Sequence, residues 1–223
     1  MKTNIEKFEE TKKLMIENIK VNYFGYFLYT VIGTIFAYYT SDGSFSYLHY
    51  LKAYLTLSFM TFLTWFGHYM LHHHNKYNPI AKLHKYTHHS PFADTFLGKL
   101  IEYSFVEFFF FGGGILLILI TMIYNNTKVW LFNPYIVLFW AAAVPIIHEI
   151  HYHQLEGSKY HEIHHKFPET TYAPEYWDII FQTKIHDLPI EDETKMLPIL
   201  IVMTMCMIPL IGTKYDVIKY FTK

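Results

Sequence analysis

The amino-acid sequence predicts an all-α integral membrane protein: a helical bundle of about four transmembrane helices with a cytoplasmic, histidine-rich helical cap. Three observations support this fold class. The 223-residue chain is 52% hydrophobic. Several of its apolar stretches approach the roughly 20 residues that cross a bilayer as a helix. All of its 15 histidines except His49 and His186 fall in two windows, 68–89 and 148–165, and each window begins where an apolar stretch ends.

Four apolar stretches predict the transmembrane helices: 24–39, 50–66, 103–124 and 129–147. A lone apolar run of roughly 10–14 residues is usually a buried core helix, but several longer runs in one chain favour a membrane. Residues 40–44 and 125–128 are short and rich in Ser, Asp, Gly, Asn and Thr, which form turns. We therefore expect two helical hairpins.

The two ends of the chain differ from this central part. Residues 1–23 mix lysines and glutamates with apolar residues, which predicts an amphipathic helix on the membrane surface. Residues 24–195 form the predicted membrane domain. Residues 196–223 begin with a borderline apolar run, 196–212, in which Pro198 and Pro209 favour a bend. We expect this C-terminal segment to be interfacial or re-entrant.

Lysine distribution predicts the orientation, because cytoplasmic loops of membrane proteins carry an excess of positive charge. The two hairpin turns contain only Lys128. The lysines of the parts proposed to be cytoplasmic are Lys2, Lys7, Lys12, Lys13, Lys20, Lys76, Lys82, Lys85, Lys99, Lys159, Lys166, Lys184 and Lys195. Both histidine windows therefore face the cytoplasm, from the endoplasmic reticulum membrane if the source is eukaryotic.

Charge and cysteine content exclude other classes. The net charge of −1 offers no basic face for nucleic acid. The single cysteine, Cys206, excludes an intrachain disulfide and an iron–sulfur cluster held by this chain alone.

The histidine spacing predicts metal ligands. His68 with His72, and His84 with His88, are four residues apart and share one face of a helix. Within the run His72-His73-His74 we favour His72, and His49 and His186 stay outside the site. Imidazole binds iron, zinc, copper and nickel, so the residue type alone does not name the ion. About ten clustered histidines exceed what one catalytic ion takes from a protein, which predicts two ions with open positions.

Several motifs resemble the histidine boxes of the fatty acid hydroxylase and sterol desaturase superfamily. Residues 65–72, WFGHYMLH, and 82–91, KLHKYTHHSP, are similar to its first two boxes, and residues 159–165, KYHEIHH, to its last. Residues 177–183, WDIIFQT, resemble the signature that follows that box, with Gln182 where glycine is usual. The resemblance covers about residues 60–185, and it implies that 24–195 is a fatty acid hydroxylase-like membrane domain.

The resemblance implies a non-haem di-iron centre, with zinc able to take the same ligands in a purified sample. Box by box, the implied metal ligands are His68, His72, His84, His88, His89, His161, His164 and His165. The third, less regular box maps onto His148 and either His151 or His153. Five acidic residues are expected to hydrogen-bond to these imidazoles, with an ordinary surface carboxylate an equal alternative for each: Asp94, Glu102, Glu149, Glu162 and Asp178. Glu107 reads either as functional or as snorkelling to the interface.

The implied activity is hydroxylation of a C–H bond in a membrane lipid, on a fatty acyl or sphingolipid chain, using dioxygen. Electrons are expected from separate partners, a b-type cytochrome and its reductase, because the sequence has neither a haem-attachment motif nor a nucleotide fingerprint. The first alternative is a sterol desaturase or sterol methyl oxidase, which the boxes do not separate. A histidine-rich metal transporter is less consistent with the sequence, since transporters place ligands near the bilayer midplane. Bis-histidine haem binding would leave most of the histidines unexplained.

Overall fold

A computed structural model describes residues 3–41, 46–73, 77–185 and 187–222, which are helical with no strand among them. His74 and His186, considered above, lie outside these ranges. The α-helices are α1 (Asn4–Tyr39), α2 (Tyr47–His73), α3 (Pro79–His88), α4 (Phe96–Ile101), α5 (Gly114–Thr127), α6 (Pro134–Ile147), α7 (Lys159–Lys166), α8 (Glu175–Phe181), α9 (Leu197–Met207) and α10 (Val217–Phe221). Two π-helices, η2 (Glu102–Phe111) and η3 (His148–Gln154), and three 3₁₀-helices, η1 (Pro91–Asp94), η4 (Glu193–Met196) and η5 (Ile208–Leu210), complete the fold.

Residues 4–23 of the predicted N-terminal segment and the first apolar stretch belong to one helix, α1. Thr3 and Glu6 form a capping box that begins it, each side chain bonding to the other's backbone amide. The boundary expected at residue 23 is instead a kink at Asn22, whose side chain bonds to the backbone of Glu191 and Glu193 at 2.9 and 2.8 Å. The kink therefore follows from a tertiary contact and not from a change of element.

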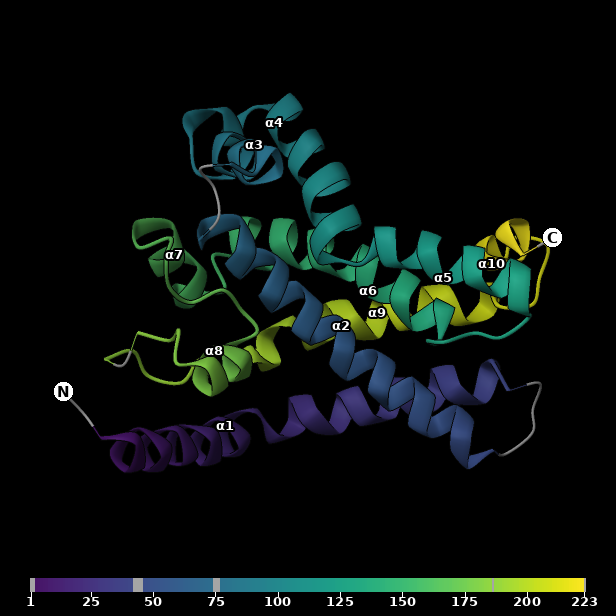
Figure 1. The fold of residues 1–223 in the computed structure, drawn as a ribbon, viewed down its shortest axis with the longest axis horizontal. Coiled ribbons are helices and arrows are strands. Elements are labelled where there is room, and N and C mark those ends of the chain that lie inside the picture. The colour runs from purple at the N-terminus through teal and green to yellow at the C-terminus, as the bar shows by residue number, and fades with distance from the viewer. Residues whose placement is uncertain (1–2, 42–45, 74–76, 186, 223) are drawn as a thin grey trace.

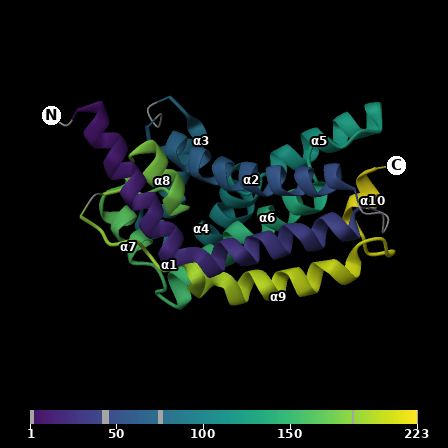
Figure 2. The same cartoon turned by 90° about the horizontal axis from the view of Figure 1, so that it is seen from below.

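The stem of the molecule consists of long helices packed side by side (Figures 1 and 2). In Figure 1, α1 and α2 are joined at one end of the molecule, and Figure 2 shows α9 running along α1. The core between these helices is apolar and buried, with Phe36, Met60, Ile136 and Leu200 fully enclosed. The rings of Phe36 and Phe139 lie 5.3 Å apart and join α1 to α6. This packing fixes the helices on which the site is built.

In the part of the chain that the structure describes, two helices are long and apolar enough to cross a membrane, Pro134–Gln154 and Glu193–Leu210, and a bent pair, Phe96–Phe111 with Gly114–Thr127, would make a third. This composition indicates a membrane protein. The prediction of four spans is confirmed in part. Stretches 24–39 and 50–66 lie in helices that are not among these candidates, and residues 196–212, expected to be interfacial or re-entrant, supply most of one candidate span. Tyrosines, threonines and one lysine lower the hydropathy of the first two stretches.

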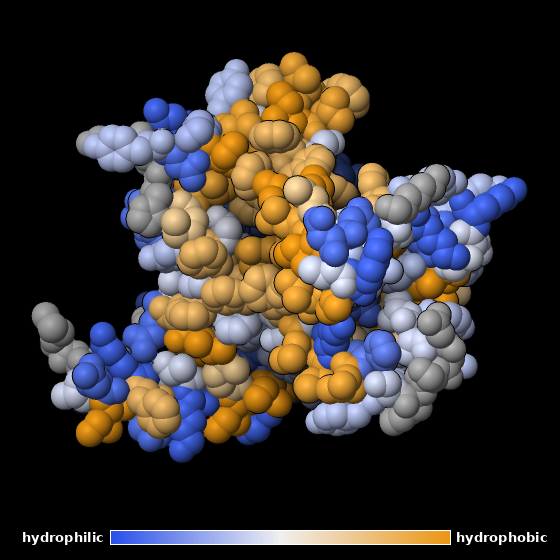
Figure 3. Space-filling view, turned by 45° about the vertical axis from the view of Figure 1, so that its right-hand side comes forward, coloured by the Kyte–Doolittle hydropathy of each residue, from blue (hydrophilic) through white to orange (hydrophobic). Residues whose placement is uncertain are grey.

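The surface agrees with a membrane environment. Figure 3 shows a broad apolar area across the middle of one face, with polar residues gathered toward its margins. Exposed apolar side chains include Ile118, Leu119 and Met122 on α5 and Val202 and Met205 on α9. Contiguous exposed apolar surface of this kind is unusual on a soluble monomer and is typical of contact with lipid or protein.

Stretch 103–124, predicted as one transmembrane helix, is bent by 48° between η2 and α5. Gly113 adopts φ +90°, which favours glycine, and a Cβ on Gly112 would lie 2.6 Å from Ala141 Cα. The glycines thus permit both the bend and the close approach of α6.

The cap gathers α3, α4, α7 and α8 at one end of the stem, opposite the C-terminus (Figure 1). Its short helices are strongly capped: the Asn78 side chain accepts hydrogen bonds from two amides of α3, with Pro79 at the first helical position, and Ser158 accepts from His161 N in α7. Such caps let helices of ten and eight residues form with few apolar residues.

Candidate metal centre

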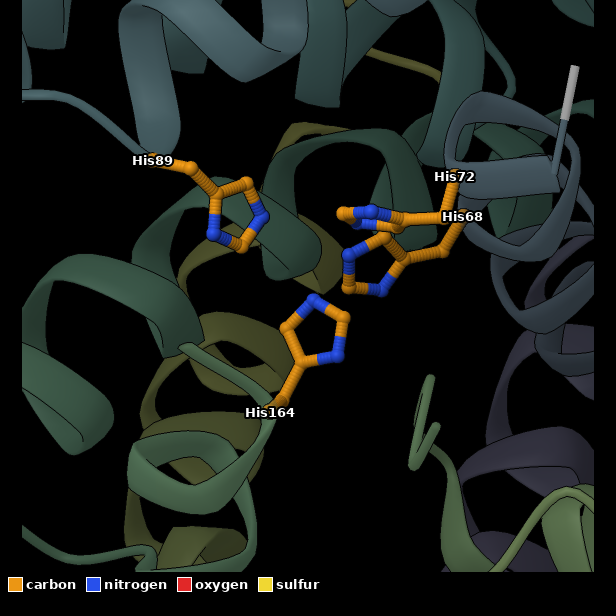
Figure 4. Close-up of side chains that lie close together, drawn as sticks. All are labelled: His68, His72, His89 and His164. Carbon is orange, nitrogen blue, oxygen red and sulfur yellow. The ribbon is translucent and has the colours of Figure 1, made fainter. Parts of the chain in front are cut away.

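Histidines from α2, α3, η3 and α7 converge where the cap meets the stem. They form two groups of four whose ligand atoms all lie within 4.8 Å of one another: His68, His72, His89 and His164, and His88, His148, His161 and His165. Figure 4 shows the first group, with His68 and His72 on one helix facing His89 and His164 from two other elements. Each group has the size and chemistry of a metal site.

The two groups are neighbours because α3 and α7 each contribute to both. His88 and His89 are adjacent in sequence, yet they belong to different groups, and His164 and His165 divide in the same way. Consecutive helical residues project about 100° apart, so one helix end can place ligands in two directions. His84 lies between the groups, since its ligand atom is within 4.8 Å of those of His88 and His89.

Four of these imidazoles have a buried Nε2 atom with no hydrogen-bond partner: His68, His88, His89 and His164. A buried nitrogen without a partner costs roughly 1–3 kcal/mol. Four in one small volume are difficult to explain as packing, whereas a bound ion would satisfy each lone pair. This donor set fits a metal, although it does not identify which one.

The opposite nitrogens of two imidazoles are held by backbone carbonyls. His68 Nδ1 donates to Tyr172 O and His164 Nδ1 donates to Thr170 O, both at 2.8 Å. A proton on Nδ1 leaves the Nε2 lone pair free to bind a metal, and ligating histidines in proteins usually have such a partner. The 170–172 loop is therefore part of the site, although it carries no ligand.

Two buried carboxylates hold two further imidazoles. His84 Nδ1 bonds to Glu102 Oε1 at 2.7 Å, and His148 Nδ1 bonds to Glu107. Glu102 also accepts a hydrogen bond from Thr87. Both glutamates are on η2, where the π-helical pattern links residues five apart, as in the Gly112 N to Glu107 O bond. One π-helix thus orients an imidazole on each side of the centre.

The separations of the Nε2 atoms match those of ligands around one ion. His72 and His84 have their Nε2 atoms 3.3 Å apart, His148 and His161 3.1 Å, and His161 and His165 3.0 Å. Nitrogens about 2.1 Å from an ion are about 3.0 Å apart at right angles and about 3.4 Å apart at the tetrahedral angle. Since His84 and His148 carry their protons on Nδ1, their Nε2 atoms present lone pairs.

Burial keeps the cap imidazoles neutral. Burial is the main cause that lowers the pKa of His164 to about 3 and of His165 to about 4 from the usual value near 6.5, and nearby imidazoles contribute to both shifts. At His164 the hydrogen bond to Thr170 O partly opposes the shift. The pKa values of His88 and His89 are lowered for the same reason, desolvation first. Neutral imidazole is the form that binds metals.

The structure separates the histidines left open by the sequence. His72 belongs to the first group, while His73 is exposed and its Nε2 lies 3.0 Å from the Tyr172 hydroxyl. His151 is buried against Gly157 and belongs to neither group. His153 is also outside both groups, but its ring stacks on His148 at 4.9 Å. Between the two, the geometry favours His153 as the neighbour of the centre.

The five acidic residues differ in their relation to the centre. Glu102 bonds to His84, as described. Asp178 is buried and accepts from Tyr172 N and Ala173 N at 3.0 and 2.9 Å, so it supports the loop that holds His68 and touches no imidazole. The other three form no hydrogen bond to an imidazole among the described contacts: Glu149 pairs with Lys99, Glu162 pairs with Lys166 on the surface, and Asp94 is exposed. Their contacts match the alternative of an ordinary carboxylate that the sequence left open for each.

The contacts of Glu107 distinguish between the two interpretations that the sequence left open. Snorkelling would bring its carboxylate to water, but the residue is 1% exposed and its carboxylate faces His148. The available signal was a second glutamate five residues after Glu102 in an otherwise apolar run. Thr170 and Tyr172 contact the imidazoles through backbone carbonyls, which every residue has, so side-chain patterns in the sequence do not reveal these contacts.

Comparison with known proteins adds no relative to this description. No family model, no curated protein sequence and no solved structure matches the chain.

Proposed function

We propose that this chain is an integral membrane di-iron oxygenase of the fatty acid hydroxylase and sterol desaturase superfamily, which hydroxylates a C–H bond of a membrane lipid. The observation that carries the proposal is the pair of four-imidazole groups, in which buried Nε2 atoms converge while partner Nδ1 atoms are held by carboxylates and carbonyls. A structural zinc ion would need only one closed group of four ligands. Two adjacent groups favour a two-metal centre.

Iron is the metal favoured by the combination of ligands and surroundings. Imidazole suits iron, and an unactivated C–H bond is too weakly acidic for any side-chain base to deprotonate. When bound, two iron ions would supply the oxidation by dioxygen that the side chains cannot perform. The position of both groups where the cap meets an apolar stem suits a lipid substrate better than a water-soluble one.

The chain's own residues would orient the ligands and exclude water. Glu102 and Glu107 fix the planes of His84 and His148, and the 170–172 loop fixes His68 and His164. Phe111 packs on His68 at 5.1 Å, which keeps one side of the centre apolar. This support limits the approach of bulk water to the reacting carbon.

The proposal also includes a source of electrons and an orientation of the protein in the membrane. The sequence offers no nucleotide fingerprint and no haem-attachment motif, so a separate b-type cytochrome and its reductase would deliver electrons. The lysine distribution would place the cap in the cytoplasm, where such donors are found, and in a eukaryote the membrane would be that of the endoplasmic reticulum.

Lipid mass spectrometry tests the proposal in a host supplied with electron-donor proteins. Cells making the wild-type chain should accumulate a lipid with one added oxygen, or with two hydrogens fewer if the reaction is a desaturation, as for a sterol. His164→Ala should abolish the product, and His49→Ala, which changes an exposed histidine remote from both groups, should retain it. Elemental analysis should find iron in the wild-type protein. Identical lipid profiles, or active protein without iron, would contradict the proposal.

A further inference from the structure

Two cavities meet inside the stem and share part of their walls. The first is lined by His68, His84, His88, His148 and His161 at one end and by apolar residues such as Trp140 and Val144 elsewhere. The second lies between α1, α2 and the start of α9. Tyr29, Glu193 and Met196 line both cavities. These three residues therefore form the partition between the imidazoles and the second cavity.

The second cavity reaches the surface of the stem. Among its lining residues, Thr30 on α1 and Ser58 on α2 are exposed. The partition is less accessible, since Met196 is buried and the Tyr29 ring packs against Trp140 at 6.1 Å. A molecule in the second cavity would thus be connected to solvent or lipid on one side and would face the metal centre across one layer of side chains.

The second cavity carries no cationic side chain among its described lining residues, and most of its hydroxyl protons are already used. Seven hydroxyl groups of these residues line it, and five of them donate their protons within the protein, whereas those of Tyr29 and Ser58 form no such bond. Tyr26 donates to Asn18 at 2.5 Å, Thr30 to Tyr26 O at 3.0 Å and Thr61 to Ser58 O at 2.8 Å. The Tyr176 hydroxyl donates to Thr61.

The fifth of these hydroxyls, that of Tyr54, also donates its proton within the protein. Thr34 donates to Thr30 O at 2.8 Å, so in the 2.6 Å contact between Thr34 and Tyr54 it is Tyr54 that donates. Four of the five donating hydroxyls still offer a lone pair to a ligand, whereas Thr61 already accepts from Tyr176 and from Trp177. Lysine and histidine are absent from the described lining, which includes one carboxyl group, that of Glu193. Because acceptors outnumber free donors and no cation lines the cavity, an uncharged ligand with a hydrogen-bond donor fits this wall better than an anion.

We propose that the second cavity binds the uncharged, donor-bearing end of a lipid, a hydroxyl or amide group, with the apolar remainder passing Tyr29 and Met196 toward the imidazoles. The inference rests on the proposed function and narrows its substrate class. A free fatty acid or a phosphate headgroup presents acceptors only and would bury a negative charge beside Glu193 without a cation. An alcohol, a sterol or an N-acyl amide presents a donor to the same oxygens.

Binding to the purified full-length protein tests the inference without any turnover. The probe is a long-chain alcohol with a photoreactive group in its chain, and cross-linked peptides are identified by mass spectrometry. Cross-links should fall on segments that line the two cavities. Unlabelled alcohol should compete at least about tenfold better than the fatty acid of the same chain length, because an unpaired carboxylate would lose its hydration. Competition by a sterol or an N-acyl amide then separates the three neutral lipid classes.

Two variants test the partition at Met196 and the carboxyl group of Glu193. Met196→Trp should reduce labelling of residues beside the imidazoles at least about tenfold, while Met205→Trp, the same change at a position that is 69% exposed, should not. Glu193→Gln should narrow the preference for alcohol over acid. Equal competition by acid and alcohol, or labelling unaffected by Met196→Trp, would overturn the inference. Selective alcohol binding by a protein that oxidises no lipid would support this cavity assignment while refuting the oxygenase.

Discussion

Replacement of Glu107 tests whether a buried carboxylate tunes one metal group. Glu107 is 1% exposed and bonds through Oε1 to His148 Nδ1. Glu107→Gln keeps an acceptor oxygen of similar shape but removes the charge, whereas Glu107→Ala removes the acceptor altogether. Because His148 belongs to the group with His88, His161 and His165, we expect the change to weaken binding of the ion in that group and to spare the other.

The magnitude follows from the lost hydrogen bond. A hydrogen bond to a charged group contributes about 1.5–3 kcal/mol and a neutral one about 0.5–1.5 kcal/mol. The difference of about 1.4 kcal/mol corresponds to roughly tenfold in affinity. We therefore expect Glu107→Gln to weaken iron binding in that group about tenfold. Glu107→Ala should weaken it about 100-fold, the upper end of the range for partners of ligating histidines.

The assay is an anaerobic titration of purified protein with ferrous iron against a competing chelator, with iron content measured after gel filtration. Glu149→Gln is the matched control, because Glu149 follows His148 in sequence but pairs with Lys99 at 3.2 Å. Unfolding of the metal-free protein should change by less than about 1 kcal/mol in Glu107→Gln, since the substitution preserves volume. Unchanged affinity in Glu107→Ala, or equal loss in Glu149→Gln, would refute the reasoning.

Two further predictions concern stability. Lys184 and Glu175 form a 2.8 Å ion pair with both side chains 1% exposed. Lys184→Met should therefore lower the free energy of unfolding, measured by chemical denaturation, by about 3–5 kcal/mol. Lys166→Met, which removes one partner of an exposed pair, should lower it by less than about 1 kcal/mol, and similar losses in the two variants would contradict the prediction. The metal-free protein should lose stability as the pH falls from about 6.5 toward 4, because the folded pKa values of His164 and His165, about 3 and about 4, lie below the unfolded value. Thermal melting measured at several pH values checks this, and a melting temperature that rises on acidification would disprove it.

The spacing of the histidines predicted which side chains lie close together at the candidate site more fully than the apolar runs predicted the candidate membrane spans. Pairs four residues apart, such as His68 with His72, have ring centroids 5.0 Å apart in α2, as the period of an α-helix requires. The division of His164 from His165 between two groups could not be predicted, because it depends on how α7 is oriented against α2 and η3. Spacing identifies candidate ligands, whereas tertiary packing distributes them.

The membrane prediction is confirmed only in part, and the two predicted spans that are not among the candidates are rich in side chains with both apolar and polar parts. Stretches 24–39 and 50–66 contain many tyrosines and threonines, which pack like apolar residues but lower the mean hydropathy. Thr34 and Tyr54, for example, use their hydroxyls to join α1 to α2 at 2.6 Å. Conversely, the prolines of residues 196–212 suggested a bend, but Pro198 lies in the first turn of α9, where proline is tolerated.

An α-helical period gives no reason to expect both Glu102 and Glu107 at the site, so the sequence left the role of Glu107 open. In an α-helix, residues 102 and 107 would project about 140° apart, so one carboxylate facing the site would turn the other toward lipid. In η2 both face histidines. No residue type in 102–111 indicates a π-helix, because the hydrogen-bond pattern of this segment depends on the tertiary fold.

The π-helical register of η2 also constrains how this chain can change. If η2 relaxed into an ordinary α-helix of the same length, Glu102 and Glu107 would project about 140° apart, and the carboxylate that holds His148 would turn away while Glu102 kept its contact with His84. Deleting one residue between the two glutamates would instead leave them four residues apart, about 40° around an α-helix, so both could still face the histidines. The number of residues between these two carboxylates is therefore tied to the helix type: five positions require the π-helix, and four require an α-helix.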